Sequence, residues 1–424
     1  MLMAEINQRF PRMVTCVQSL HRNALPVNKI GVHVKEQCDI AGISAAVRPG
    51  MSVAITAGSR GIASYAAVLR ALVGYIRDLG AKPFLFPAMG SHGGATAEGQ
   101  LDALASLGIT ESVMGCPIKS GMEVVQLGLT DAGVPVYLDR HASEAEAIVV
   151  VNRIKPHTNF HGRWESGLCK MLVIGAGKHR QAIAMHGMGT PGLRDHMPKV
   201  AETVLREAPV VAGLALIEDA DHCLSRIVGI PADEIMAREA ELLEEVRANS
   251  PALPVDDIDL LIIEQIGKQI SGTGIDTNVV GRCRLLDFAA FDRPVVRCLV
   301  ALDLTPDSHG NAIGVGLADL ISRRLADKVD PRVTAVNCIT GLSPQLAALP
   351  IALDSDREVI RTALDYFCAH VPLDQVRVVR IRDTLSLDEI HVSESLGAEI
   401  ATCENARIIG EAEEMQFAED GSLL

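Results

Sequence analysis

The segment from Met51 to Gly94 constrains the fold most strongly, because two short apolar runs flank one helical repeat. Residues 52–56 and 83–86 have the length and composition of buried strands. Between them, apolar side chains recur three or four residues apart, as on one face of a helix, and Gly80 stands where glycine ends many helices. A strand, a helix and a second strand in this order predict a parallel sheet.

The same alternation continues beyond this segment and is interrupted once. Further strands are predicted at residues 147–151, 171–174, 260–263, 295–301, 333–336 and 376–381. Residues 249–254 contain two prolines after a charged helix and predict a linker. We therefore expect two α/β domains with mainly parallel sheets, at residues 1–253 and 256–393, and an active site in the cleft between them. Residues 394–424 would form a tail that packs back on the N-terminal domain.

Charge and cysteine content exclude several classes of function. The net charge is −14 and only 3% of the 424 residues are aromatic, so neither a basic nucleic-acid surface nor a base-stacking platform is expected. The ten cysteines form no closely spaced pair, which favours reduced thiols over a disulfide framework or a structural zinc site. Without a leader pattern or an apolar run of bilayer length, we expect a cytoplasmic protein that binds no membrane.

Polar residues with catalytic chemistry follow several of the predicted strands. Arg60, His92 and His157 come after three strands of the first half, and the carboxyl ends of parallel strands meet at one edge of a sheet, where ligands bind. Lys268 follows a strand of the second half in the same way. A plainer interpretation is open for both histidines, because glycines beside His92 and a proline beside His157 also fit ordinary surface turns.

Four further candidate positions lie between residues 165 and 186. Lys170 has apolar neighbours, so it is either a lysine whose end reaches the surface or a partly buried amine that acts as a nucleophile or covalent anchor. Gly175 and Gly177 follow a predicted strand and suit backbone contact with a phosphate, although the third glycine of a dinucleotide-binding loop is missing. His186 is either a core histidine or a metal ligand.

Together these motifs resemble the nickel-pincer-nucleotide lactate racemase family. The likeness covers roughly residues 50 to 310 and rests on Arg60, the Gly90-Ser91-His92 turn, the runs 152–157 and 165–171, Gly175, Gly177, His186 and residues 272–278. The sequence departs from the family at residues 57–61, where Ala-Gly-Ser-Arg-Gly replaces the usual Asp-x-Thr-Arg-Pro.

The resemblance implies how a cofactor would be held. The family's cofactor is a nickel-pincer nucleotide, the Ni(II) complex of pyridinium-3-thioamide-5-thiocarboxylic acid mononucleotide. Lys170 matches the lysine that anchors it through a covalent thioamide link, and His186 matches the histidine that ligates the nickel. Gly175 and Gly177 would contact the same cofactor, and Arg60 is a further candidate for this contact. Because the pincer group supplies one carbon and two sulfur ligands, only one protein ligand is needed for square-planar Ni(II).

The resemblance also implies the reaction, which is racemisation or epimerisation of a 2-hydroxy acid. The C2 proton beside a carboxylate is very weakly acidic, so departure of a hydride from C2 avoids a carbanion. His92 and His157 match the two acid/base histidines, one for each enantiomer, since an imidazole exchanges protons near neutral pH. Arg60 matches the arginine that binds the substrate carboxylate, and Lys268 stands for a second-domain lysine that helps to bind substrate.

Two alternatives differ from this hypothesis in class. The first is a nicotinamide-type dehydrogenase on a similar fold, which the missing third glycine and the lack of a clear ribose-binding acid disfavour. The second is a non-catalytic binding protein that retains the fold. The presence of both candidate bases together with Lys170 and His186 disfavours this second alternative. The identity of the 2-hydroxy acid and the oligomeric state cannot be derived from the sequence.

Overall fold

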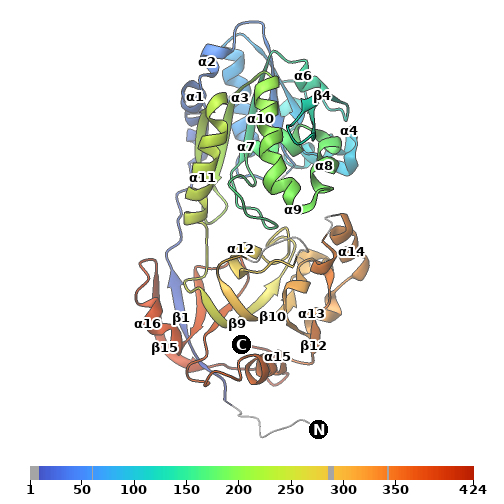
Figure 1. The fold of residues 1–424 in the computed structure, drawn as a ribbon. Coiled ribbons are helices and arrows are strands. Elements are labelled where there is room, and N and C mark those ends of the chain that lie inside the picture. Colours follow the sequence, from blue (N-terminus) through green and yellow to red (C-terminus); the bar gives the residue numbers. More distant parts are fainter. Residues whose placement is uncertain (1–8, 60, 285–290, 341–342) are drawn as a thin grey trace. The chain divides into compact units, whose positions relative to one another are not determined.

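The chain divides into two compact units (Figure 1). The computed structural model describes residues 9–59, 61–284, 291–340 and 343–424. His21–Ser250 form one unit, here called the internal unit, whereas Met1–Leu20 and Pro251–Leu424 form the other, here called the terminal unit. The division after Ser250 falls inside the predicted linker, but the first residues of the chain belong with its C-terminal half.

The internal unit contains a five-stranded sheet in the order β3-β2-β6-β7-β8. Its strands are parallel except for β8, which runs antiparallel to β7. The bounds are β2 Ser52–Ala57, β3 Lys82–Pro87, β6 Ala147–Arg153, β7 Val210–Glu218 and β8 Leu224–Pro231, and a separate hairpin is formed by β4 Val124–Leu129 and β5 Pro135–Asp139. The predicted parallel sheet and the α/β class are therefore confirmed.

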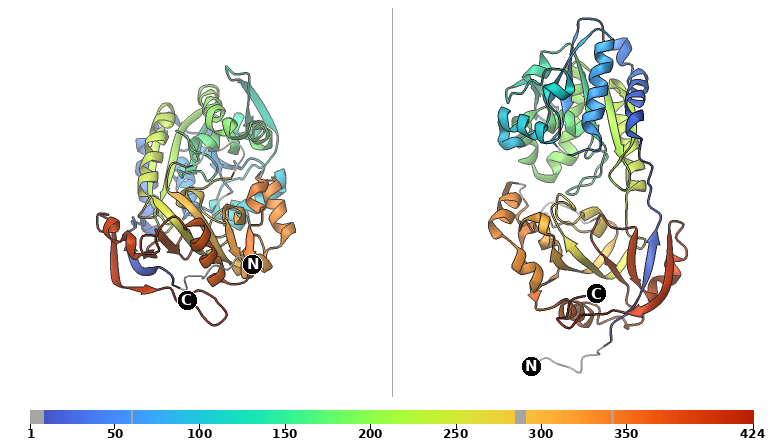
Figure 2. Two further views of the ribbon diagram at one scale, coloured as in Figure 1. Left: turned by 60° about the horizontal axis from the view of Figure 1, so that its bottom comes forward. Right: turned by 180° about the vertical axis from the view of Figure 1, so that it is seen from behind.

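Helices cover both faces of this sheet. Helices α1 and α3 pack on one face, where alternate residues of β2, β6 and β7 join them in one apolar core; in the view from behind, these blue helices lie in front (Figure 2). On the other face, Gly213 leaves room for Leu168 of α7 and Ile235 of α11, since an added Cβ would lie 2.6 Å from Leu168. The helices are α1 Ile30–Ile40, α2 Ile43–Ala46, α3 Tyr65–Asp78, α4 Ala97–Ser106, α5 Glu111–Met114, α6 Arg140–Ser143, α7 Leu168–Lys170, α8 Lys178–His186, α9 Gly189–Pro191, α10 Met197–Glu207 and α11 Ile235–Asn249.

The terminal unit contains an eight-stranded sheet in the order β12-β11-β10-β9-β13-β14-β1-β15. The strands from β12 to β13 are parallel, and the remaining pairs are antiparallel. The bounds are β1 Arg12–Gln18, β9 Asp257–Ile266, β10 Val295–Leu304, β11 Leu320–Ser322, β12 Ile351–Leu353, β13 Val378–Ile381, β14 Glu389–Ser393 and β15 Ala406–Glu414, with helices α12 Thr277–Val280, α13 Arg323–Lys328, α14 Pro331–Thr340, α15 Asp356–Thr362 and α16 Gly397–Ile400.

The C-terminal tail differs from its predicted position. It was expected to pack on the N-terminal domain, but its strand β15 pairs with β1 inside the terminal unit. Strand β1 itself was assigned to the N-terminal domain, whereas it lies between β14 and β15. The pairing joins opposite ends of the chain, and a local hydrophobic pattern contains no information about so distant a partner.

Two predicted strands are wrong. Residues 171–174 lie in a π-helical segment, η3 (Met171–Gly175), and residues 333–336 lie in α14. A four-residue apolar run fits a strand and one turn of helix equally well, so its composition alone does not decide between them. None of the helices in the described part of the chain is long and apolar enough to cross a membrane.

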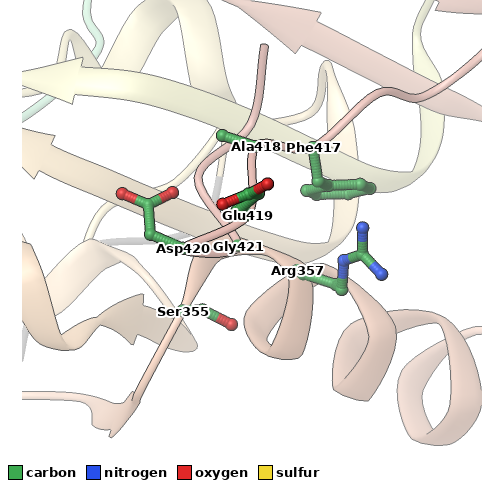
Figure 3. A pocket seen from close by; sticks show the side chains of 7 residues that line it. All are labelled: Ser355, Arg357, Phe417, Ala418, Glu419, Asp420 and Gly421. Atoms are coloured by element: carbon green, nitrogen blue, oxygen red, sulfur yellow. The ribbon is translucent and has the colours of Figure 1, made fainter.

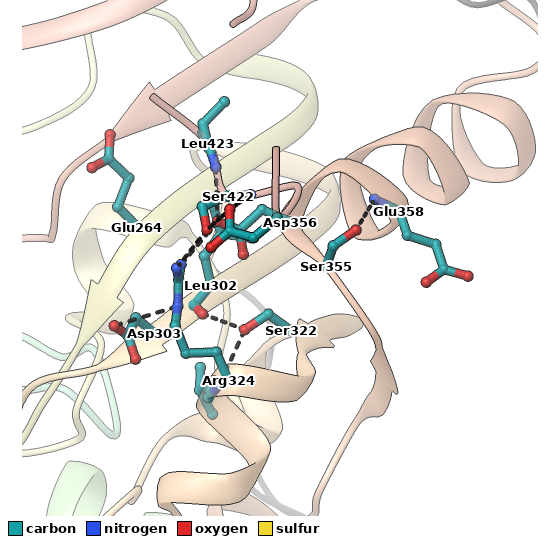
Figure 4. Close-up of polar contacts among 12 residues, drawn as sticks. Glu264, Leu302, Asp303, Ser322, Arg324, Ser355, Asp356, Glu358, Ser422 and Leu423 are labelled. Carbon is teal, nitrogen blue, oxygen red and sulfur yellow. Dashed lines mark hydrogen bonds and ion pairs between the residues drawn. The ribbon is translucent and has the colours of Figure 1, made fainter. Parts of the chain in front are cut away.

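A buried carboxylate fixes the last residues of the chain in the terminal unit. Asp356 accepts hydrogen bonds from Arg324 at 2.8 Å and from the backbone of Leu423 at 3.0 Å (Figure 4). The adjoining segment 417–421 and the first turn of α15 line an open pocket with Arg357 over the Phe417 ring (Figure 3). None of the residues predicted to bind cofactor or substrate lines this pocket.

Candidate active site

The carboxyl ends of β2 and β3 bring two candidate loops into contact. The strands are parallel and in register up to Ala57 and Pro87. The next residues of each strand lead to Ser59 and His92, whose Oγ and Nδ1 atoms share a short hydrogen bond. The predicted convergence of strand-end loops is thus confirmed for these two. Arg60, the candidate for the substrate carboxylate, lies outside the described residues.

The exposed His92 turn is supported by a buried polar network. Gln100 of α4 donates its Nε2 hydrogens to the backbone oxygens of Gly90, at 3.0 Å, and His92, at 3.3 Å. The Gln100 oxygen accepts from the Lys178 amine at 2.9 Å, and the same amine donates to the Pro87 oxygen at 2.6 Å. These contacts fix the backbone of the turn and leave the imidazole of His92 at the surface.

Lys178 is a fully buried charge at the first residue of α8. Its amine lies 3.3 Å from a carboxylate oxygen of Asp139, which is also fully buried. Burial lowers the pKa of Lys178 and raises the pKa of Asp139, while their mutual attraction opposes both shifts. A buried ion pair of this kind is costly to break, because the remaining partner is left charged in a low-dielectric interior.

His157 lies on a loop that Glu165 holds from within. The loop is closed by backbone hydrogen bonds between Lys155 and Ser166, of 2.8 and 3.2 Å. The fully buried Glu165 carboxylate accepts from the backbone nitrogens of His157, at 2.5 Å, and Gly162, at 2.9 Å. The backbone around His157 is therefore fixed by a side chain of its own loop.

Helix α11 holds the same loop from outside. Arg247 pairs with Glu165 and donates to the Gly162 oxygen at 2.7 Å. Nearer the start of the helix, the Met236 oxygen accepts from the Trp164 indole at 2.7 Å. Both ends of α11 are thus bound to the segment that precedes the lysine-bearing helix α7.

Glu239 of α11 caps helix α7, which ends at Lys170. Its carboxylate accepts from the backbone nitrogen of Cys169 at 2.8 Å, and complete burial raises its pKa to about 7. A Cβ added at Gly167 would lie 2.2 Å from a Glu239 oxygen, so this approach requires glycine. The Gly167 oxygen accepts from Asn152, at the end of β6, at 2.8 Å. The lysine is therefore placed by the sheet edge and by α11 together.

Lys170 lies within electrostatic reach of His186. Desolvation by neighbouring protein atoms and, second, the Lys170 ammonium lower the pKa of His186. The His186 side chain, at the last residue of α8, is nevertheless exposed in part, and Lys170 is half-buried. A neutral, accessible imidazole is the form that binds a metal ion.

Gly175 ends the π-helical segment η3 and Gly177 lies in the short turn before α8, so neither glycine follows a strand. A Cβ at Gly175 would lie 2.7 Å from the Ala88 oxygen, and one at Gly177 would lie 2.4 Å from the Val173 oxygen. The Gly175 oxygen accepts from the Gly90 nitrogen at 3.3 Å. Close packing against the β3 loop thus explains the glycine at 175, while contact of either residue with a cofactor stays a prediction.

Lys268, the remaining candidate, lies in the terminal unit just after β9. Its amine donates to the Gly272 oxygen at 2.6 Å, and its backbone nitrogen donates to Ser308 at 3.0 Å. The loop after β9 therefore has an ordered structure of its own.

Sequence reasoning missed the supporting residues of the site. They are Ser59, Asp139, Glu165, Lys178, Glu239 and Arg247. Their partners are mostly far away in sequence, so no local pattern marks them as buried. Among them, Glu165 could have been recognised from the sequence, because it lies in the same short run as Lys170.

Comparison with known proteins was made at three levels. Residues 6–194 match the family described as lactate racemase N-terminal domain. A comparison with curated protein sequences gave no match. Among solved structures, the lactate racemase apoprotein from Thermoanaerobacterium thermosaccharolyticum aligns with a TM-score of 0.49 and 14% identity, over 88% of this chain and 94% of that chain.

Proposed function

We propose, from the match of residues 6–194 to the lactate racemase N-terminal domain family, that this chain is a racemase or epimerase of a 2-hydroxy acid. We further propose that it uses a nickel-pincer nucleotide attached covalently to Lys170. The family supports a racemase-type enzyme; the cofactor and the substrate class are the proposal.

The observation that carries the proposal is the proximity of Lys170 and His186. Covalent attachment needs an accessible amine, and the nickel needs one protein ligand at the distance that the attached group spans. A half-buried amine within electrostatic reach of an exposed imidazole supports this arrangement. In the described part of the chain, no group of three or more histidine, cysteine or acidic side chains is placed to hold a metal ion. A single protein ligand, His186, therefore suits a cofactor that itself supplies the other ligands of the nickel.

When bound, the nickel-pincer nucleotide would supply a reversible acceptor for the C2 hydride. The chain's own residues would bind and orient the substrate around it. Arg60 is proposed for the carboxylate and Lys268 for a further substrate contact, while His92 and His157 would contact the substrate hydroxyl. Gly175 and Gly177 would lie against the cofactor. The networks around Glu165 and Lys178 support this division, because they fix the backbone at both histidines before substrate binds.

Metal content and intact mass test the cofactor. Protein isolated from a host that makes the nucleotide should contain about one nickel per chain and a covalent mass increment. Lys170→Ala should abolish the increment, and His186→Ala should abolish nickel binding. Lys199→Ala, at an exposed lysine of α10, should change neither. Active wild-type protein at its sequence mass would exclude the proposal.

Chiral chromatography tests the reaction. A panel of 2-hydroxy acids, including short aliphatic, sugar-derived and dicarboxylic members, should reveal one pair of stereoisomers that the loaded protein interconverts. A nicotinamide-dependent change in absorbance with the same panel would instead favour a dehydrogenase.

A further inference from the structure

The loop between β2 and α3, which carries Arg60, is attached to the rest of the internal unit on both sides of that residue. Before it, the Gly58 nitrogen donates to the hydroxyl of the buried Tyr65 at 3.0 Å. After it, the Ala63 nitrogen donates to Oε1 of Glu218 at 2.9 Å. Because the loop contains two glycines, its own backbone restricts it little, and its conformation depends on such contacts.

Glu218 connects this loop to the ends of two further strands. It is the last residue of β7, and β6 lies between β7 and β2 in the sheet. Its second oxygen, Oε2, pairs with Arg153, the last residue of β6. One carboxylate therefore joins the ends of β6 and β7 to the backbone of the loop after β2.

The Glu218 carboxylate is charged, although its side chain is only 7% exposed. Burial alone would raise its pKa, but a hydrogen bond from His222, the charge of Arg153 and the hydrogen bond from Ala63 lower the pKa below its usual value. A hydrogen bond to an anion is stronger than one between neutral groups. The contact with Ala63 is therefore a firm attachment of the loop.

The backbone directly after Ala63 has a conformation that depends on such attachment. Ser64 has a φ of 58°, in the left-handed region that residues other than glycine seldom occupy. A conformation of this kind persists where the surrounding structure determines it. On one side the Glu218 contact holds Ala63, and on the other the Val68 nitrogen donates to the Ser64 oxygen at 3.0 Å in the first turn of α3.

We propose that Glu218 is a positioning residue that sets the affinity for substrate by holding the Arg60 loop in its binding conformation. This inference rests on the proposed function, in which Arg60 binds the substrate carboxylate. Glu218 acts through the backbone of Ala63 and does not itself contact the substrate. Because the carboxylate is bound in the ground state and the transition state alike, loss of Glu218 should weaken substrate binding and spare the chemical step.

Amide hydrogen exchange in the cofactor-free protein tests the attachment. Glu218→Ala should accelerate exchange at Ala63 roughly tenfold or more, since a hydrogen bond to a charged group is lost. Glu218→Gln keeps the size of the side chain and an oxygen that can accept from Ala63, so its effect should be smaller. The matched control is Glu146→Ala, which removes a carboxylate that accepts from the Ser52 nitrogen at the opposite end of β2, at 2.8 Å. It should leave exchange at Ala63 unchanged, and unchanged exchange in Glu218→Ala would overturn the inference.

A double-mutant cycle in the loaded enzyme tests whether Glu218 acts through Arg60. Glu218→Ala should raise KM roughly tenfold and keep kcat near the wild-type value. A purely structural role would instead reduce the amount of active enzyme, and with it the apparent kcat, at an unchanged KM. In the Arg60→Ala background, Glu218→Ala should raise KM no further, because the residue through which it acts is already absent. Multiplicative increases in KM would overturn the inference.

The two experiments separate failure of this inference from failure of the proposed function. Loaded wild-type protein without turnover on any 2-hydroxy acid would refute the proposed function. A wild-type KM in Arg60→Ala would refute the role of Arg60 and, with it, the effect of Glu218 on affinity. Hydrogen exchange at Ala63 decides in either case whether Glu218 holds the loop.

Discussion

The ammonium of Lys170 lies within electrostatic reach of the His186 imidazole, although the two residues belong to different helices. After desolvation, this ammonium is the second cause that lowers the pKa of His186. The proposed attachment at Lys170 and the proposed nickel ligand His186 would require the two side chains to lie near each other, and this electrostatic effect supports that proposal. Removal of the Lys170 charge tests this interaction and requires no cofactor.

Lys170→Met should raise the pKa of His186 in the cofactor-free protein. The substitution keeps an unbranched side chain and removes the positive charge that disfavours the imidazolium. Proton NMR titration of the His186 ring measures the change. The exposed Lys199→Met serves as the control and should leave the titration unaltered. An identical pKa in all three proteins would mean that the two side chains do not interact.

Ser59→Ala should slow turnover moderately, because it removes the hydroxyl that orients His92. One hydrogen bond of about 0.5–1.5 kcal/mol corresponds to a roughly two- to tenfold fall in kcat. Ser59→Thr retains the hydroxyl and should preserve most of the rate. Steady-state kinetics on the loaded enzyme would decide the matter, and equal rates for wild type and Ser59→Ala would rule out this orienting role.

Glu239→Gln should alter the pH dependence of stability. Burial raises the pKa of Glu239 from 4.5 to about 7, so the folded protein binds this proton more tightly than the unfolded chain. The contribution to the free energy of unfolding is therefore complete below pH 4.5 and is lost as the pH rises through 7. Its size is on the order of 3 kcal/mol.

Urea unfolding of both proteins across this pH range measures the effect. Glutamine can still accept from the Cys169 nitrogen, so the cap is retained while the titration is removed. As the pH rises, the free energy of unfolding of the wild type should fall relative to that of Glu239→Gln. Parallel pH profiles would contradict the raised pKa.

Lys178→Met should destabilise the internal unit strongly, by roughly 3–5 kcal/mol, since it leaves the buried Asp139 carboxylate without its cation. Denaturant unfolding provides the measurement. The double variant Lys178→Met/Asp139→Leu should recover much of the loss, because it replaces the whole pair with apolar groups. If the double variant is as unstable as the sum of the two single variants, the pair is not coupled.

The fold was predictable where local patterns decide it. The apolar runs that became β2, β3 and β6 and the helical repeat that became α3 were recognised correctly. The repeat is long enough to identify a helix, and its position between two short runs favours strands for both. Residues 171–174 were assigned to a strand, but the run continues the helix that carries Lys170.

The site was predictable only in its chemically distinctive residues. His92 and Lys170 were proposed from their local sequence and from a resemblance, whereas the side chains that support them were not. Glu239 lay in a helix that was recognised only as charged, and its burial follows from its approach to Gly167 in another part of the sequence. Contacts of this range depend on the assembled fold, so sequence patterns do not reveal them.

The position of β1 between β14 and β15 has a consequence for biosynthesis. This strand is translated before the internal unit, but both neighbours that complete its backbone hydrogen bonds are translated after that unit. The internal unit, in contrast, has its full sequence by Ser250. Because domains commonly fold in the order of their synthesis, the nascent chain would carry an unpaired, aggregation-prone strand edge until β14 and β15 have been translated.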